Sequence, residues 1–189
     1  FTLLAGRFDY PNILRQPAGE VLLRFHREQS GVTPLWWMMF EAAILFLIVS
    51  ILAVRLVKMP PAAATLTVVT GAFGGLVQIF GLSRWVFLVP LLAERYAAPN
   101  TADTERAAAK MVFEAFHQWA GAGIGEFLGY LFTGLWTWFI AAAMLRQGQR
   151  WRGGIGIASA VGILFGVLET IPLPFAGMVN AAGYTLWSF

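Results

Sequence analysis

Long stretches without a charged side chain restrict how this chain folds more than any other feature. No Asp, Glu, Lys or Arg occurs in residues 59–83, 127–145, 153–168 and 170–189. Between Glu28 and Arg55 the single charge is Glu41. A helix of about 20 apolar residues crosses the hydrocarbon core of a bilayer. Because 12% of the residues are charged, against about a quarter in soluble domains, a soluble globule is excluded. We expect an all-α, polytopic transmembrane helical bundle.

Charged and Pro-containing interruptions predict a single membrane domain, residues 1–189, with about five spans. The predicted spans cover about residues 36–57, 62–82, 119–145, 154–171 and 175–189. The chain begins in apolar sequence at Phe1, without Met. A sixth span before Phe1 is therefore a further hypothesis.

The first 35 residues mix charged, apolar and Pro residues and predict a surface segment on the outer side of the membrane. Within residues 1–35, the pattern over 20–29 is typical of a short amphipathic helix lying at the membrane surface. Gly31 and Pro34 follow it, and both favour the end of a helix. We expect the first span to begin as a separate helix after Pro34.

The connection over residues 83–118 is the most charged part of the chain. Its segment 85–92 is apolar but contains Pro90, so it either continues the second span or forms a separate interfacial piece. Thr101 or Asp103 is predicted to cap a further helix. That helix is expected to run straight into the third span.

The distribution of Lys and Arg predicts the orientation of the chain. The short loops 55–61 and 146–153 share one side and contain no acidic residue. Their basic residues are Arg55, Lys58, Arg146, Arg150 and Arg152. Basic short loops stay in the cytoplasm, so we expect these two loops to be cytoplasmic. Residues 1–35 and 83–118 are then periplasmic or extracellular.

Three carboxylates fall inside predicted spans, where an ionisable side chain is a candidate functional residue. They are Glu41, Glu126 and Glu169. At about 1.5 Å per helical residue, all three lie in the outer half of the membrane. One hypothesis is that they line a single outward-facing cavity. The other is that each one reaches water or a neighbouring helix near the interface.

The third span also carries a polar stripe. Glu126, Tyr130, Thr133 and Thr137 are spaced i, i+4, i+7 and i+11, which places them on one face of an α-helix. A polar path for a proton, an ion or a small polar ligand is one interpretation. Hydrogen bonding between helices is the other.

Glycines at small-x-x-x-small spacing predict close packing between spans. The positions concerned are Gly71, Gly75, Gly121, Gly125, Gly129, Gly162 and Gly166.

Histidine is scarce, with His26 in the surface segment and His117 near the third span. Glu114 and His117 form an E-x-x-H pair, the spacing of metal ligands in carboxylate-bridged bundles, although such a site needs two copies of the motif. Both histidines lie on the predicted outer side, so haem ligation by the pair is a second hypothesis. Ordinary surface residues are the competing interpretation.

Other chemistries are excluded or lack a signal. The chain has no cysteine, which excludes disulfides, thiolate metal sites, iron–sulfur clusters and covalent c-type haem. It contains no P-loop, dinucleotide fingerprint or serine nucleophile elbow. The 13 basic residues are scattered, so nucleic acid is not an expected partner. No motif requires a cofactor, no catalytic residue is predicted, and an enzyme is not favoured.

The segment Phe116–Trp136, the basic loop after it and Gly154 to Gly156 resemble an uncharacterised domain-of-unknown-function family of roughly six-helix bacterial inner-membrane proteins. In that family a histidine and a glycine-rich helix lead through an Arg-containing loop into another Gly-rich helix. The matching positions are His117, Gly121, Gly134, Leu135 and Gly154. The resemblance covers about residues 110–160. It implies the fold and a location in the bacterial inner membrane, and no activity.

Three functions compete at this point. The first is an accessory or scaffolding subunit of a larger membrane assembly, with the bilayer and other proteins as partners and no chemistry of its own. The second is a transporter or sensor for a small molecule, an ion or a proton, built on the intramembrane carboxylates. The third is a haem- or metal-dependent membrane oxidoreductase.

Overall fold

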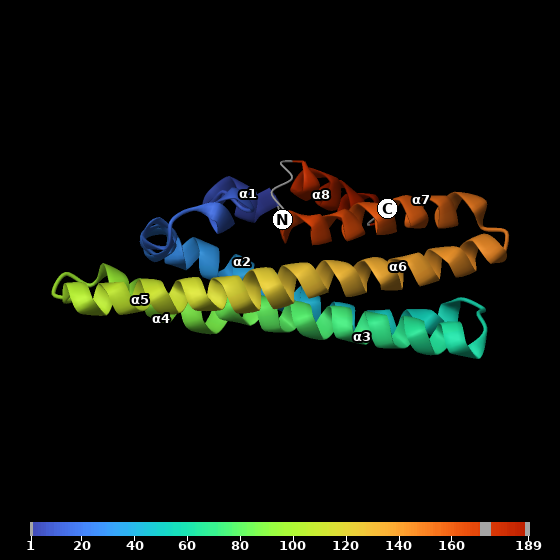
Figure 1. Ribbon diagram of the computed structural model, residues 1–189, viewed down its shortest axis with the longest axis horizontal. Helices are drawn as coiled ribbons and strands as arrows, with labels where there is room; N and C mark the ends of the chain where they lie inside the picture. Colours follow the sequence, from blue (N-terminus) through green and yellow to red (C-terminus); the bar gives the residue numbers. More distant parts are fainter. Residues whose placement is uncertain (1, 171–174, 188–189) are drawn as a thin grey trace. The chain divides into compact units, whose positions relative to one another are not determined.

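The computed structural model describes residues 2–170 and 175–187, and within them the chain forms helices and no strand (Figure 1). Four helical runs are long and apolar enough to cross a membrane: Ala18–Leu56, Pro61–Ala97, Asp103–Arg146 and Arg150–Glu169. The expected polytopic helical bundle is confirmed. The predicted span 175–189 is described as α8, Ala176–Trp187, and its flanking residues 171–174, 188 and 189 lie outside the described part.

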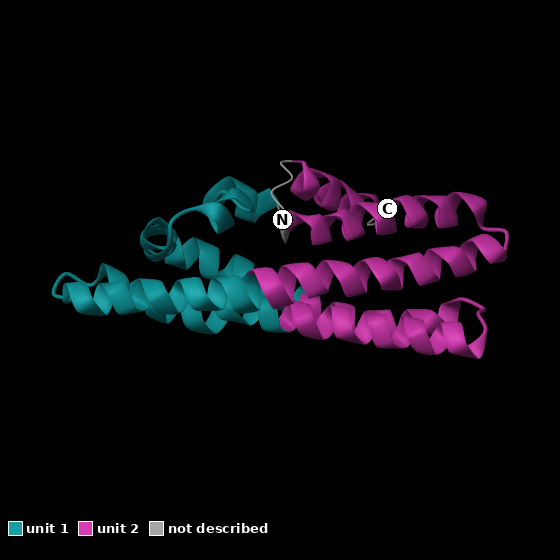
Figure 2. Ribbon diagram, viewed as in Figure 1, with its two compact units in different colours: residues 1–42, 80–121 teal, residues 43–79, 122–189 magenta. Residues whose placement is uncertain are grey.

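Contacts between residues divide the chain into two compact units (Figure 2). Unit 1 comprises residues 1–42 and 80–121, and unit 2 comprises residues 43–79 and 122–189. Each of the first three long helical runs contributes residues to both units.

An aromatic core holds unit 1 together. Its centre is a pair of stacked indoles, Trp36 and Trp85, whose ring centroids are 4.5 Å apart at an interplanar angle of 3°. Phe8 meets both indoles edge-on, and Phe25 stacks on Trp85. The helices that supply the unit 1 core are α1 (Thr2–Phe8), η1 (Asn12–Arg15), the first part of α2 (Ala18–Ala53), the π-helix η3 (Arg84–Leu88), α4 (Val89–Ala97) and α5 (Asp103–Phe116).

Helix α2 corrects one expectation, because it does not break at Gly31 or Pro34. It runs without interruption from Ala18 to Ala53. Pro34 cannot donate a backbone hydrogen bond to the Ser30 carbonyl, but both residues are exposed, so that carbonyl is not trapped in the core. The completely buried Val32 and Trp36 anchor the same stretch in the aromatic core. Packing therefore overrides the helix-ending signal.

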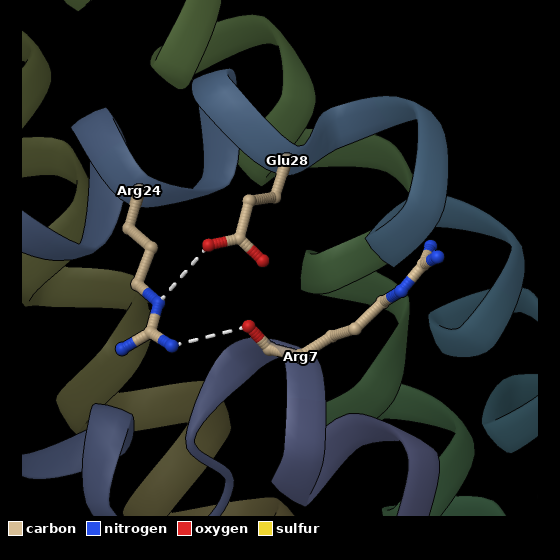
Figure 3. A network of polar contacts seen from close by, with 3 residues as sticks. All are labelled: Arg7, Arg24 and Glu28. Carbon is tan, nitrogen blue, oxygen red and sulfur yellow. Dashed lines mark hydrogen bonds and ion pairs between the residues drawn. The ribbon is translucent and has the colours of Figure 1, made fainter.

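Polar contacts near the start of the chain join α1 to α2 (Figure 3). Arg24 donates from Nη2 to the carbonyl oxygen of Arg7 over 3.1 Å, and its Nε lies 3.4 Å from Oε1 of Glu28. The side chains of Arg24 and Glu28 are about one-third exposed, and such solvated ion pairs contribute little stability. The aromatic core is the main support of α1.

The connection over residues 83–118 is helical on both sides of its turn. The second long helix, α3 (Pro61–Ser83), continues through η3 into α4, so segment 85–92 continues the helix of the second span and is not a separate piece. The predicted caps are wrong: Ala102 occupies the N-cap of α5, with no side-chain cap bond, and the Thr101 hydroxyl instead donates to the Arg95 carbonyl. The expected continuity holds, because one helical run extends from Asp103 to Arg146.

Small residues set the packing of unit 2. Helix α6 (Gly129–Arg146) lies beside α7 (Arg150–Phe165), and α7 lies beside α8 (Figure 1). A Cβ atom on Gly162 would lie 2.8 Å from the Cα of Gly183. A Cβ on Gly75 of α3 would lie 2.6 Å from the Cβ of Leu47 on α2. No larger residue fits these crossings without moving a helix.

Candidate functional site

An outward-facing carboxylate distinguishes one surface of unit 1, which we call the Glu41 patch: Trp37, Met38, Glu41 and Phe87. Glu41 is exposed on α2, one helical turn after Trp37. The rings of Trp37 and Phe87 are 5.4 Å apart, and Met38 and Phe87 are each 61% exposed. No hydrogen bond or ion pair joins the Glu41 carboxylate to another described residue. The patch therefore presents one carboxylate among apolar side chains, and Glu41 does not line an interior cavity of unit 1.

The other two intramembrane carboxylates belong to unit 2. Glu126 lies in the long π-helix η4 (His117–Leu128), is half-buried, and has one carboxylate oxygen shielded from solvent. Glu169 lies in η5 (Gly166–Thr170), with Oε1 3.4 Å from the point where a Cβ on Gly177 of α8 would be. Glu169 thus meets the beginning of α8.

The polar stripe of the third span divides between two helix interfaces. Thr133 faces α3, where its hydroxyl accepts a 2.8 Å hydrogen bond from Nε2 of Gln78. Tyr130 contacts other helices, with its ring against Gly166 of η5 and 6.3 Å from the ring of Tyr184 on α8. These contacts favour hydrogen bonding between helices at Thr133 over a single continuous path along the stripe.

The π-helix η4 changes the geometry expected for the start of the stripe. Its hydrogen bonds join residues i and i+5, so each turn takes more residues than in an α-helix. Angular positions derived from α-helical spacing do not apply to Gly121, Gly125 and Glu126, which lie within it. From Gly129 onward, in α6, the α-helical spacing of Tyr130, Thr133 and Thr137 holds.

The interior of unit 2 contains two completely buried hydroxyl groups on neighbouring helices. Thr137 of α6 and Ser159 of α7 are completely buried, and neither hydroxyl has a hydrogen-bond partner among the described residues. Gly134 of α6 packs on Leu164 of α7, and Gly153 of α7 packs on Leu145 of α6, so Thr137 and Ser159 lie at about the same level of the antiparallel α6–α7 pair. A buried hydroxyl without a partner is unusual in a folded protein and calls for an explanation.

Sequence reasoning missed several polar residues that the structure places between helices. Gln78 bonds Thr133, and Asn180 donates from Nδ2 to the Ile163 carbonyl over 2.9 Å. The Trp136 indole donates to the Ser50 carbonyl over 3.0 Å, beside Gly71. The available signal was the one side-chain amide in each of the predicted spans 62–82 and 175–189, Gln78 and Asn180, which hydropathy averaging hides.

A buried cation, Arg84, was also missed, because it belongs to the charged connection 83–118, which was expected to lie outside the membrane. Its side chain is 7% exposed and donates from Nη1 to the Gly81 carbonyl over 2.5 Å. A Cβ on Gly121 would lie 2.6 Å from the guanidinium group. Gly121 therefore makes room for this side chain within unit 1. Gly129, by contrast, is in ordinary contact with Gln78 of α3 in unit 2.

The two histidines differ in their surroundings: His117 is half-buried and His26 is exposed. Nε2 of His117 lies 2.8 Å from the Leu14 carbonyl oxygen, and its ring stacks on Phe113. Glu114 and His26 are exposed. Among the described residues, no group of three or more His, Asp or Glu side chains is placed to hold a metal ion. In the structure the contact between His117 and the Leu14 carbonyl joins η1 to the start of η4.

Comparison with known proteins identifies the relationship of the chain. No curated protein and no solved structure matches it. The family model described as "Domain of unknown function (DUF4386)" matches residues 1–189, the whole chain. The helical architecture and the four apolar helical runs agree with the membrane family expected from the glycine-rich segment after His117. The chain therefore belongs to the DUF4386 family, a domain of unknown function.

Proposed function

We propose that this protein is an accessory subunit of a larger membrane protein assembly and that it docks through the Glu41 patch. The observation that carries the proposal is an exposed carboxylate, without a partner among the described residues, on a helical run whose most apolar window the rest of the chain barely covers. In the most apolar window of the run Ala18–Leu56, 11% of residues are buried, against 39–44% in the other three runs.

The position of Glu41 along α2 makes this exposure costly. Glu41 lies 13 residues after Glu28 (41 − 28) and 14 residues before Arg55 (55 − 41) in an uninterrupted helical run. Each interval corresponds to about 20 Å along the helix axis. A carboxylate such as Asp costs about 2.5–3.5 kcal/mol of insertion free energy at the centre of a transmembrane helix, and the cost to Glu41, expected in the outer half of the membrane, is below that value. A partner that supplies an opposite charge offsets much of that cost.

The chemistry of the patch defines the expected partner. Charge complementarity calls for a transmembrane helix with a Lys or Arg at the depth of Glu41. The exposed Trp37, Met38 and Phe87 provide flat apolar contacts around that ion pair. Met adapts readily to a partner surface, and aromatic residues are enriched at protein interfaces.

Site-specific photo-crosslinking in native membranes tests the proposal. A photoreactive amino acid replaces Met38 in the full chain, and the matched control replaces Met178, which is 73% exposed on α8 of unit 2. We expect position 38 to yield one protein adduct whose crosslinked peptide is apolar and contains Lys or Arg. Glu41→Lys should abolish this adduct. Adducts with lipid alone at position 38, or an adduct unchanged by Glu41→Lys, would contradict the proposal.

A proton transporter or sensor in unit 2 is a second candidate, favoured by the buried hydroxyls of Thr137 and Ser159. Glu126 and Tyr130 precede Thr137 on the helical run Asp103–Arg146, and Ser159 lies on the neighbouring helix α7. Proteoliposomes containing a pH-sensitive dye would report proton flux. This candidate predicts flux that is lost in Glu126→Gln while the unfolding free energy is unchanged. Wild-type proteoliposomes that conduct no protons would rule it out.

A further inference from the structure

Two short loops that are far apart in sequence meet at one end of unit 2. Gln147, in the turn between α6 and α7, donates from Nε2 to the carbonyl oxygen of Lys58 over 3.3 Å. Lys58 follows the 3-10 helix η2 (Val54–Leu56) at the end of the first long helical run. The hydrogen bond joins residues 89 positions apart, and Met59 accepts a further contact from the hydroxyl of Thr67 on α3. The two loops are therefore held side by side.

This junction gathers positive charge, and we call it the basic end. Its members are Arg55, Lys58, Arg146, Arg150 and Arg152. All five side chains are exposed, and none has an ion-pair partner among the described residues. Residues 55–61 and 146–153 contain no Asp or Glu. Nothing within these loops neutralises the five charges.

An exposed indole marks the depth of the basic end relative to a bilayer. Trp151 lies between two of the arginines and is 81% exposed. Leu56, in the other loop, is 86% exposed. Trp residues at the ends of transmembrane helices settle at the level of the lipid headgroups. The neighbouring guanidinium groups then lie at the level of the lipid phosphates.

We infer that the basic end binds the headgroups of anionic phospholipids. Four of its five cations are arginines, whose planar donors engage phosphate oxygens in pairs. Each basic residue near an anionic leaflet contributes about 1 kcal/mol to association, which corresponds to about fivefold in affinity. The inference is independent of the Glu41 patch, because it concerns other residues and another ligand.

Binding of defined lipids to the purified full chain tests this inference. The protein in nonionic detergent is titrated with cardiolipin, phosphatidylglycerol or phosphatidylcholine, and bound lipid is counted by native mass spectrometry. The test variant carries Arg146→Gln, Arg150→Gln and Arg152→Gln. The matched control carries Arg27→Gln, Arg95→Gln and Lys110→Gln, three exposed positions in unit 1. Both variants change the formal net charge from +3 to 0 (3 − 3).

We expect wild type and the control to bind both anionic lipids at least tenfold more tightly than phosphatidylcholine. The test variant should lose at least tenfold of that affinity, and its thermal unfolding should match that of the control. Millimolar inorganic phosphate should not displace the lipid, because it lacks the acyl chains that hold a headgroup at the loop. Equal losses in the two triple variants, or equal affinity for all three lipids, would overturn the inference. Displacement by phosphate would assign the site to a free anion instead.

Discussion

The two units of this protein differ in how their side chains pack, although three long helical runs contribute residues to both. The unit 1 core contains 17 buried apolar residues, and its centre is aromatic. The corresponding cluster of unit 2 contains four: Val57, Trp136, Ile140 and Ala143. Among the described residues, unit 2 buries seven uncharged polar side chains, whereas the polar side chain buried in unit 1 is Arg84.

The contrast matches the surroundings, water or lipid, in which each kind of packing is stabilising. Burial of large apolar side chains stabilises a core when the alternative is water. Inside a bilayer that advantage disappears, and helices associate through small residues and hydrogen bonds between helices. Unit 2 uses those devices at Gly162 and Gly183 and in the hydrogen bond from Gln78 to Thr133. In unit 1 the residues up to Trp36 and from Trp85 onward supply an aromatic core of the kind that water-soluble proteins use, and Glu41 lies outside that core, next to the end of the unit at residue 42.

The largest effect is expected from the centre of unit 1. Trp36→Ala removes a completely buried indole that stacks on Trp85, and such truncations cost about 3–5 kcal/mol of unfolding free energy. The matched control is Trp37→Ala, next along the helix, which is 39% exposed and should cost about 1 kcal/mol. Denaturant titration in detergent measures both values. Equal costs would mean that the indole stack does not support unit 1.

A smaller effect is expected where α7 crosses α8 in unit 2. Gly162→Ala places a Cβ atom 2.8 Å from the Cα of Gly183 and should cost about 1–3 kcal/mol by forcing the helices apart. Gly154→Ala on the same helix meets nothing within 4 Å and should be neutral or stabilising, because Ala favours helix over Gly. The same titration measures both. An unchanged unfolding free energy in Gly162→Ala would mean that close packing of small residues does not support unit 2.

Hydrogen bonds between helices should contribute less than either packing feature. A double-mutant cycle with Gln78→Leu and Thr133→Val should give a coupling energy of about 0.6–1.7 kcal/mol. Thr65→Val is the control, because that hydroxyl bonds the Pro61 carbonyl of its own helix. A coupling energy near zero would assign the stability of the α3–α6 contact to its glycines alone.

The smallest effect is expected at Thr137. Thr137→Val removes a buried hydroxyl that has no partner among the described residues, so it should leave the unfolding free energy unchanged or raise it slightly. Thr133→Val, four residues earlier, serves as the comparison, because its hydroxyl is bonded. A clear loss of stability in Thr137→Val would reveal a bonded partner for that hydroxyl.

The fold was largely predictable from sequence, because a long charge-free stretch indicates a membrane-spanning helix whichever other helices it packs against. Local signals failed where packing outweighs them. Pro34 is accommodated in α2 because Val32 and Trp36 are held in the aromatic core. The π-helix η4 was not predictable, since its residues satisfy α-helical periodicity equally well.

The candidate site was predictable only in part. Hydropathy singled out Glu41 as a charge in an apolar span, but not the side of α2 on which it lies. That depends on which helix face the unit 1 core occupies. For the basic end, the sequence indicated the residues but not their assembly. The same Lys and Arg residues predict the orientation of the chain, whereas the structure shows that a hydrogen bond from Gln147 to Lys58 joins their two loops. A contact across 89 residues leaves no trace in the sequence of either loop.

Reversal of charge at Glu41 tests the central claim most directly. The assembly extracted in mild detergent is sized for wild type, for Glu41→Lys, and for Glu41→Lys combined with an acidic replacement of the basic residue found in the crosslinked partner. The account predicts that Glu41→Lys releases the partner and that the reciprocal change restores the assembly. An assembly of unchanged size in Glu41→Lys, or wild-type protein extracted as a monomer, would contradict it.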